Sequence, residues 1–226
     1  MYRSSLIEKY QKLALLLIGL LPASRIKNVL MNLHGCNIGK DCKIEPNIFL
    51  RTRNIKLEQG SSIGLGNVFR DLNKLHLGQG STIRNFNWIS ASPVLERKGG
   101  GSSLTLGKMT SVTSRHYFDC SGGILLGDFT TIAGVRSTLI SHQIDIKRGE
   151  QSVSPINIGK YCLISSNSAV CPGVFIEDFT VVGMGTVLAG EYCVQKSLIV
   201  GPKGQIKKIE ISGEYFERIQ RSVSDQ

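Results

Sequence analysis

Aliphatic residues recur at every sixth position in the C-terminal half of this chain: Ile158, Ile164, Val170, Ile176, Val182 and Leu188. A helix repeats every 3.6 residues and a strand every 2.0, so a strict period of six fits neither element. Four residues after each of the first five comes a residue small enough to turn inward at a tight corner: Cys162, Ser168, Val174, Thr180 and Thr186. The pattern predicts a solenoid in which three six-residue faces make one triangular coil, with coils stacked about 4.8 Å apart.

The same phrase recurs upstream: an aliphatic residue, then Gly or Glu, then a small residue four places on. It starts at 38 ("IGKDC"), 57 ("LEQGS"), 77 ("LGQGS"), 106 ("LGKMT") and 126 ("LGDFT"). With "IGKYC" at 158 and "IEDFT" at 176 these make seven coil starts, separated by 19, 20, 29, 20, 32 and 18 residues. The two long intervals predict loops that leave the coil at residues 91–103 and 143–155, and insertions in a solenoid often form its binding face.

The length of 226 residues predicts one domain with an additional element at each end. We expect an N-terminal helical cap over residues 1–36, with short helices around 5–20 and 24–33, and then the solenoid over 37–203. Residues 204–226 should return as a short strand followed by a helix near 214–221. The open ends of a solenoid expose unpaired backbone, so elements that cover them are expected.

The apolar run from Leu13 to Leu21 is too short to span a bilayer, which needs about 20 residues. A signal peptide has weak support, because Glu8 dilutes the basic stretch before the run and no clear Ala-x-Ala follows it. The alternative to a cap is a helix on the inner face of a membrane, with Arg3, Arg25 and Lys27 at the headgroups. We favour the cap, although the two are compatible, and expect a cytoplasmic protein that is either free or at the inner membrane face.

The net charge of +10 and the pI near 9.4 favour an anionic partner: a phosphorylated cofactor, an acidic membrane surface or a nucleic acid. Nucleic acid is disfavoured, because no zinc-finger, homeodomain or RNP-type motif occurs. The six cysteines lack paired spacing and any Cys-x-x-Cys, which disfavours a zinc site and predicts reduced thiols. Cys120, near His116 in the sequence, could act as a nucleophile, but a buried structural thiol is the commoner case.

Five stretches of the C-terminal half follow one another in a recognisable order: "LISHQID", "INIGKYCLI", "VCPGVFI", "VVGMGTVL" and "IVGPKGQIKKI". In order and spacing they resemble the hexapeptide-repeat acyltransferases, over roughly residues 38–203. The resemblance implies an all-β solenoid, a left-handed parallel β-helix of about seven coils. It also implies a homotrimeric, acetyl-CoA-dependent O-acetyltransferase, most similar to the subgroup that acetylates sugars in cell-surface polysaccharide (capsule, exopolysaccharide or O-antigen) biosynthesis.

Acyl transfer from a thioester to a sugar hydroxyl needs a general base, and His142 is the first candidate. It ends a coil directly before the second loop, where its imidazole can face a groove, and an unperturbed pKa near 6.5 keeps much of it neutral at pH 7. Asp119, one coil earlier at a similar offset, could orient the ring. It could equally cap the turn at Ser121–Gly123. Asp145 is a weaker partner, and His116 could bind the acceptor or be a second base, though we favour a surface position.

The resemblance places coenzyme A in a cleft between subunits, along the coils that follow the histidine. It implies contacts with Ser165, Ser166, Gly183, Gly185 and Thr186, and phosphates near Lys203, Lys207 and Lys208. These lysines could equally form a solvated surface. Three features depart from the family pattern: Leu163 stands for a frequent Trp, Ser165 for a frequent Gly, and the Gly-Pro-Lys ending is short.

Other functions are compatible with the same residues. An N-acetyltransferase acting on an amino sugar or nucleotide sugar would use the same base and cleft, and a non-catalytic scaffold is a further alternative. A zinc carbonic anhydrase of this fold would need three histidine ligands, and only His116 and His142 lie in this region, so no metal site is predicted. A group of basic residues could meet an acidic acceptor, although we favour solvation: Arg51, Arg53, Arg70, Arg84, Arg97 and Lys98.

Overall fold

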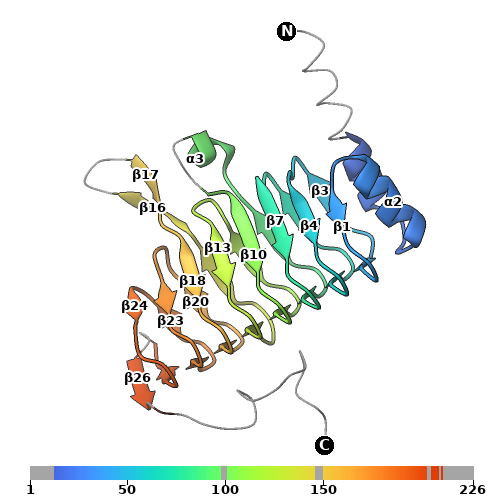
Figure 1. Ribbon diagram of the computed structural model, residues 1–226. Helices are drawn as coiled ribbons and strands as arrows, with labels where there is room; N and C mark the ends of the chain where they lie inside the picture. Colours follow the sequence, from blue (N-terminus) through green and yellow to red (C-terminus); the bar gives the residue numbers. More distant parts are fainter. Residues whose placement is uncertain (1–12, 98–100, 146–149, 203–204, 209, 211–226) are drawn as a thin grey trace, which may run out of the picture.

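The computed structural model describes residues 13–97, 101–145, 150–202, 205–208 and 210. Three sheets wrap around one axis as a left-handed parallel β-helix, as the period of six and the family resemblance predict (Figure 1). Each coil contributes one short strand to each sheet, and we name the sheets faces A, B and C in chain order. The first corner joins face A to face B, the second joins B to C, and the third joins C to the next strand of A.

Most of the strands are two to four residues long and lie in register with those of the coils before and after. Face A contains β1 (Asn37–Ile38), β4 (Ile55–Leu57), β7 (Lys74–Leu77), β10 (Ser103–Leu106), β13 (Ile124–Leu126), β18 (Ile156–Ile158), β21 (Phe175–Ile176) and β24 (Glu191–Tyr192). Face B contains β2 (Lys43–Ile44), β5 (Ser62–Ile63), β8 (Thr82–Ile83), β11 (Ser111–Val112), β14 (Thr131–Ile132), β19 (Leu163–Ile164), β22 (Val181–Val182) and β25 (Leu198–Val200), with β26 (Gln205–Lys208) antiparallel at its end. Face C contains β3 (Ile48–Leu50), β6 (Val68–Arg70), β9 (Trp88–Ser90), β12 (Tyr117–Asp119), β15 (Thr138–Ile140), β20 (Ala169–Val170) and β23 (Val187–Leu188).

The seven predicted coil starts pair with one another in register along face A: Ile38, Leu57, Leu77, Leu106, Leu126, Ile158 and Ile176. All seven are buried, and so are the five small residues expected beside the aliphatic series. Face A continues one strand beyond these starts, because Tyr192 pairs with Ile176. The repeat pattern did not predict this coil start, because the inward position there is filled by the aromatic Tyr192 and not by an aliphatic residue.

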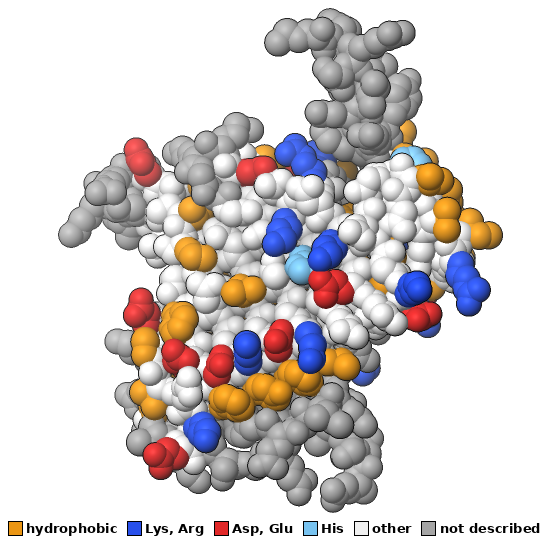
Figure 2. Space-filling view, viewed as in Figure 1, with side chains coloured by type: hydrophobic (Ala, Val, Ile, Leu, Met, Phe, Trp, Pro, Cys, Tyr) orange, Lys and Arg blue, Asp and Glu red, His pale blue; other side chains and the backbone are white. Residues whose placement is uncertain are grey.

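The first corner carries a stacked row of large side chains: Met109, Phe129, Tyr161 and Phe179, all in left-handed backbone with φ from 55 to 59°. The Tyr161 ring lies 4.8 Å from that of Phe129 and 5.1 Å from that of Phe179. A left-handed conformation costs a bulky residue on the order of 1 kcal/mol, which ring stacking offsets. The residues that directly precede these four alternate in charge along the chain: Lys108, Asp128, Lys160 and Asp178. Figure 2 shows a row of charged side chains beside a row of hydrophobic ones.

Helices cover the N-terminal end of the β-helix. Residues 13–19 are helical, and α2 (Arg25–Leu33) follows with Ser24 as its N-cap. Their outer surface is apolar, with seven exposed aliphatic side chains: Leu13, Leu17, Leu20, Leu21, Ile26, Val29 and Leu33. No helix among the described residues is long and apolar enough to cross a bilayer. Contact of this surface with a membrane stays a prediction, and the expected helical residues 5–12 and 214–221 lie outside the described residues.

One buried lysine ties the cap to the first coil. The Lys27 ammonium donates to the carbonyls of Gly19, Leu21 and Glu45 at 2.8, 2.7 and 2.9 Å. Burial lowers the pKa of Lys27 from 10.5 to about 8. The expectation that Lys27 reaches lipid headgroups is therefore wrong, because its three donors are already bonded inside the protein.

Replacing Lys27 with Met should lower the free energy of unfolding by about 2 to 3 kcal/mol, because three buried carbonyls lose their donor. The midpoint of urea unfolding measures the change. The control is Lys43→Met, whose exposed side chain pairs only with Glu45 at the surface, so its effect should stay within about 0.5 kcal/mol. Equal midpoints for the two variants would contradict the structural role given to Lys27.

Candidate active site

Two insertions leave the β-helix at the third corner. The first lies between β9 and β10 and contains the short helix α3 (Pro93–Arg97). The second lies between β15 and β18 and forms an antiparallel hairpin of β16 (His142–Asp145) and β17 (Glu150–Val153). Both rise from the same edge of the molecule, and α3 contacts β17 (Figure 1). Strand β12 lies between β9 and β15, so the end of β12 is enclosed by the two insertions.

His142 and Asp119 meet at this enclosed point. His142 begins the hairpin, Asp119 ends β12, and Nδ1 of the histidine lies 3.0 Å from Oδ1 of the carboxylate. The Nδ1–H bond does not point along this line within the angular range of a hydrogen bond, so the contact is one of electrostatic proximity. The histidine side chain keeps 31 % of its surface exposed while Nδ1 is buried, so the exposed surface belongs to the rest of the ring.

Backbone and hydroxyl groups hold Asp119 in place. Its Oδ1 accepts a hydrogen bond of 3.0 Å from the Ser121 N–H, which is the turn cap considered from the sequence. Its carbonyl oxygen accepts one of 2.7 Å from the Ser141 hydroxyl, and that hydroxyl in turn accepts from the Gly122 N–H. Asp119 thus both caps the turn and lies beside His142, so the two sequence interpretations describe one side chain.

This pair has the composition of a general base and its orienting carboxylate. A carboxylate beside Nδ1 favours the tautomer with the proton on Nδ1, which leaves Nε2 free to accept a proton. It also stabilises the imidazolium that forms when the proton is taken up. At the third corner Nε2 can therefore receive the proton of a bound hydroxyl or amine.

His116 lies at the second corner, away from this pair. It is one rung of a buried polar ladder, in which each side-chain oxygen or nitrogen accepts a hydrogen bond from the next rung's backbone N–H: Asn47, Asn67, Asn87, His116 and Ser137. Its Nδ1 accepts from Ser137 N–H at 3.1 Å, and its Nε2 contacts the Thr113 hydroxyl at 2.8 Å. The expected surface position is wrong, because this side chain is 2 % exposed. Both ring nitrogens are bonded within the core, so the geometry gives no support to a second base or an acceptor contact.

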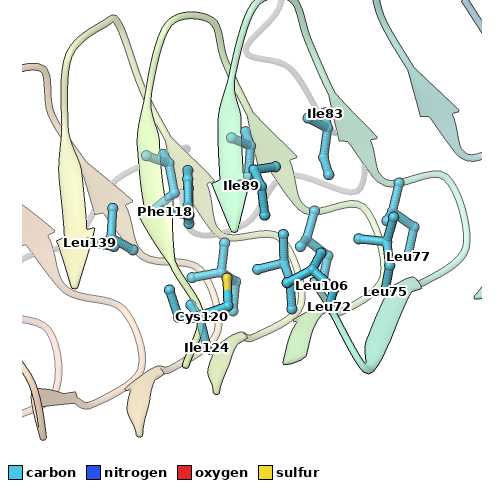
Figure 3. Close-up of a cluster of buried hydrophobic side chains, with 14 of the residues drawn as sticks. Leu72, Leu75, Leu77, Ile83, Ile89, Leu106, Phe118, Cys120, Ile124 and Leu139 are labelled. Atoms are coloured by element: carbon cyan, nitrogen blue, oxygen red, sulfur yellow. The ribbon is translucent and has the colours of Figure 1, made fainter. Parts of the chain in front are cut away.

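Cys120 is also part of the core. Figure 3 shows its sulfur among aliphatic and aromatic side chains that include Leu106, Ile124 and Phe118. Burial raises the pKa of this thiol well above its usual value, which disfavours the reactive thiolate. The alternative of a Cys120 nucleophile activated by His116 is therefore contradicted.

The residues predicted to contact coenzyme A lie at the second corner. Ser165 and Ser166 follow β19, whereas Gly183, Gly185 and Thr186 follow β22. Gly185 has φ +73° and open space where a Cβ would be, and both serines are partly exposed. Thr186 differs, because the whole residue is buried, so this chain offers none of its surface to a ligand.

Within one chain, these residues and His142 lie at opposite edges of face C. The strands of this face have two or three residues, and a strand rises about 3.3 Å per residue, so the two edges are on the order of 10 Å apart. A single chain therefore brings Asp119 to His142 but leaves the predicted donor residues at another corner. Lys203 and the side chains of Asp145, Lys207 and Lys208 lie outside the described residues.

Three of the basic residues considered from the sequence pair with carboxylates. Arg51 donates to Asp71 at 2.8 Å through Nη2, and Arg70 lies 3.4 Å from the same carboxylate while covering the ring of Trp88. Arg53 lies 3.6 Å from Glu96. Arg84 has no carboxylate partner among the described residues, and the side chains of Arg97 and Lys98 lie outside them.

Two other features lie away from the His142 pair. Among the described residues, no three His, Cys, Asp or Glu side chains are close enough to hold a metal ion. A cavity of about 370 Å³ lies between the N-terminal helices and the first coil, with Ser24, Asn28 and Cys42 in its lining. Its position at the capped end separates it from the third-corner pair.

Similarity to solved structures is consistent with this fold. No family model matches the chain, and no curated protein matches its sequence. A mutant of AntD, an N-acyltransferase from Bacillus cereus, in complex with dTDP-4-amino-4,6-dideoxyglucose and coenzyme A, has a TM-score of 0.56 at 14 % identity, over 86 % of this chain and 93 % of that one. The polySia-specific acetyltransferase NeuO has a TM-score of 0.55 at 17 % identity, over 78 % of this chain and 75 % of that one.

Replacing His116 with Asn should flatten the acid side of the stability profile. Burial lowers the pKa of His116 from 6.5 to about 4, so between these values the unfolded chain binds a proton that the folded chain does not. The stability is complete above pH 6.5 and is lost as pH falls towards 4, by on the order of 3 kcal/mol. Urea unfolding from pH 7 to 4 measures this.

Asn is the matched substitution because three earlier rungs of the same ladder are Asn. A stability profile of His116→Asn identical to that of the wild type between pH 7 and 4 would contradict this structural role of His116.

Proposed function

We propose that the protein is an acetyl-CoA-dependent O-acetyltransferase that moves an acetyl group to a sugar hydroxyl in the biosynthesis of a cell-surface polysaccharide. The observation that carries this proposal is the His142–Asp119 pair, held between two insertions on a fold shared with sugar-directed acyltransferases. AntD, which has this fold, was crystallised with coenzyme A and a nucleotide-linked sugar, and NeuO is a polySia-specific acetyltransferase. Capsule, exopolysaccharide and O-antigen are the polysaccharide classes that the motif resemblance suggests.

His142 is the proposed general base. Acetyl-CoA supplies the thioester carbonyl, and the acceptor hydroxyl supplies the nucleophilic oxygen. Nε2 takes the hydroxyl proton as the new C–O bond forms, and the imidazolium then returns that proton to the departing thiolate as the C–S bond breaks. Asp119 holds the ring and balances its positive charge, and a positioned base of this kind contributes about 10² to 10⁴ in rate.

A homotrimer would complete the site. The base lies at the third corner and the proposed donor residues at the second, so the third corner of one subunit facing the second corner of its neighbour would unite them. The open Gly185 position and the partly exposed Ser165 and Ser166 suit close approach of a narrow pantetheine arm. The backbone N–H groups of this corner are the proposed oxyanion donors.

N-acetyl transfer to an amino sugar is the second candidate. AntD, with a similar fold, is an N-acyltransferase crystallised with an amino sugar nucleotide. An amine would present its proton to the same Nε2, so the base and its carboxylate would serve both reactions. The acceptor panel of the experiment below includes amino sugars and separates the two outcomes.

Replacing His142 with Ala should lower acetyl transfer at least about a hundredfold, because the general base is lost. Release of free thiol from acetyl-CoA is measured with a panel of sugars, amino sugars, nucleotide sugars and oligosaccharides. The matched control is His76→Ala, a histidine on face A that contacts Glu58. No acceptor-dependent release by the wild type, together with no binding of coenzyme A, would favour the non-catalytic scaffold.

Two inactive variants should restore activity to each other if the site is shared between subunits. His142→Ala removes the base, and Gly185→Phe fills the donor corner; Phe86 already occupies a left-handed position at this corner, so the fold tolerates the ring there. In co-expressed random trimers about a quarter of the interfaces combine an intact base with an intact donor corner. About a quarter of wild-type activity is therefore expected, whereas a site within one chain would leave the mixture inactive.

A further inference from the structure

Three arginines lie along the second corner on successive coils. Arg84 follows β8, Arg115 follows β11 and Arg136 follows β14, and all three are exposed. Arg115 and Arg136 occupy directly stacked positions, since the Arg136 N–H donates to the Arg115 carbonyl at 3.0 Å. Arg84 lies nearer the start of its corner, where its N–H donates to the Val112 carbonyl at 2.8 Å, so it flanks this stacked pair. We refer to the three residues together as the arginine column. Of the three, only Arg84 was considered from the sequence, because the neighbouring positions of Arg115 and Arg136 depend on how the coils stack.

The charge of the arginine column is not compensated at this corner. No carboxylate pairs with any of the three side chains in the described part of the chain. The corner segments from 64–67 to 183–186 contain no Asp or Glu: GLGN, RNFN, TSRH, AGVRS, SSNS and GMGT. The basic residues near the third corner, by contrast, pair with Asp71 or Glu96.

The first corner, to which no function is assigned, has a different pattern of charge. There Lys108, Asp128, Lys160 and Asp178 alternate in sign along successive coils, so each cation has an anion beside it. Like charges on adjacent strands destabilise a sheet, and left-handed backbone adds on the order of 1 kcal/mol for each non-glycine residue. Arg115 and Arg136 have φ of 60° and 64° and lie about one strand spacing apart, so they carry both costs.

The arginine column lies next to the proposed reaction centre. It occupies the N-terminal half of the second corner, whereas Ser166 and Gly185 continue the same corner in the C-terminal half. Its last member, Arg136, lies beside Val135, whose N–H donates to the Ser166 hydroxyl at 3.3 Å. If acetyl-CoA binds at Ser166, an acceptor that lies against the preceding, N-terminal coils would contact the guanidinium groups.

Face C adds two exposed aromatic side chains beside the column. Trp88 and Tyr117 are neighbours in register on β9 and β12, and each is 42 % exposed. Arg84 and Arg115 lie in the turns that precede these two strands. Arg70 lies over the Trp88 ring, so Tyr117 is the side chain of this pair that offers a sugar ring an apolar contact. Arginines bind carboxylate or phosphate in a bidentate manner.

We propose that the arginine column binds the negative charges of the acceptor, so that the substrate is an anionic glycan or glycan precursor carrying carboxylate or phosphate groups. That the bound molecule is the acetyl acceptor rests on the proposed function. That it is anionic rests on the uncompensated charge of the arginine column. Carboxylates along a polysaccharide and the pyrophosphate of a nucleotide-linked sugar share this chemistry. The binding experiment distinguishes the two sources.

The test compares two double variants that remove the same charge from different corners. Arg115→Gln with Arg136→Gln alters the arginine column, and Lys108→Gln with Lys160→Gln is the control at the first corner. Four probes are titrated by calorimetry into the full-length protein at low and at raised salt: tetragalacturonate, UDP-N-acetylglucosamine, neutral maltotetraose and coenzyme A. Urea unfolding confirms that each variant is folded.

One or both anionic probes should bind the wild type more tightly than maltotetraose, and the arginine double variant should weaken that binding about tenfold or more. Raised salt should weaken the wild type more than the arginine variant, and the lysine control should behave as the wild type. Tetragalacturonate alone would indicate a polysaccharide acceptor, and UDP-N-acetylglucosamine alone a nucleotide-linked one.

Three results would overturn the proposal: no preference of the wild type for an anionic probe, equal losses in the two double variants, or a loss confined to coenzyme A. The last would assign the column to the donor phosphates. Failure of the proposed function is distinguishable, because a protein that binds the anionic probes through the column but neither binds coenzyme A nor transfers acetyl groups keeps this inference and loses the other.

Discussion

Parallel strand pairing between successive coils positions every other feature of this protein. Backbone hydrogen bonds hold each strand in register with the next, so residues far apart in sequence become neighbours about 4.8 Å apart. Residues at the same coil position therefore form columns, and each column has one environment. The buried ladder from Asn47 to Ser137 is such a column, and it satisfies polar groups that the tight second corner would otherwise bury unpaired.

The three corners share this architecture but differ in chemistry. The first corner alternates charges beside stacked rings, which suits a surface that only has to be stable. Two insertions leave the β-helix at the third corner, and the His142–Asp119 pair lies at their base. The second corner stacks Arg115 and Arg136, its segments from 64–67 to 183–186 contain no Asp or Glu, and Gly185 is open. This distribution, with the His142 pair at one corner and the arginines and Gly185 at another, suits the proposal that a neighbouring subunit completes the site.

Several features could be predicted from the sequence because they depend on local periodicity. Aliphatic residues every sixth position and small residues four places later determine which side chains point inward, so the seven coil starts fall in register as expected. The offset of Asp119 within its coil placed it near His142 for the same reason. His116 was misjudged, because a histidine four residues past an aliphatic position can fill a small-residue site when a hydrogen-bonding ladder receives it.

From the sequence, the period of six predicted the fold and the seven coil starts, and the family motif together with the coil offset indicated His142 and Asp119 as candidates for one site. Which charges are compensated is visible in the folded chain alone. Arg51 pairs with Asp71 on the next coil, whereas Arg115 and Arg136 have no carboxylate among the described residues. The Arg51–Asp71 pair joins residues twenty positions apart, and its side-chain directions depend on the left-handed corners, which the spacing of aliphatic residues does not report.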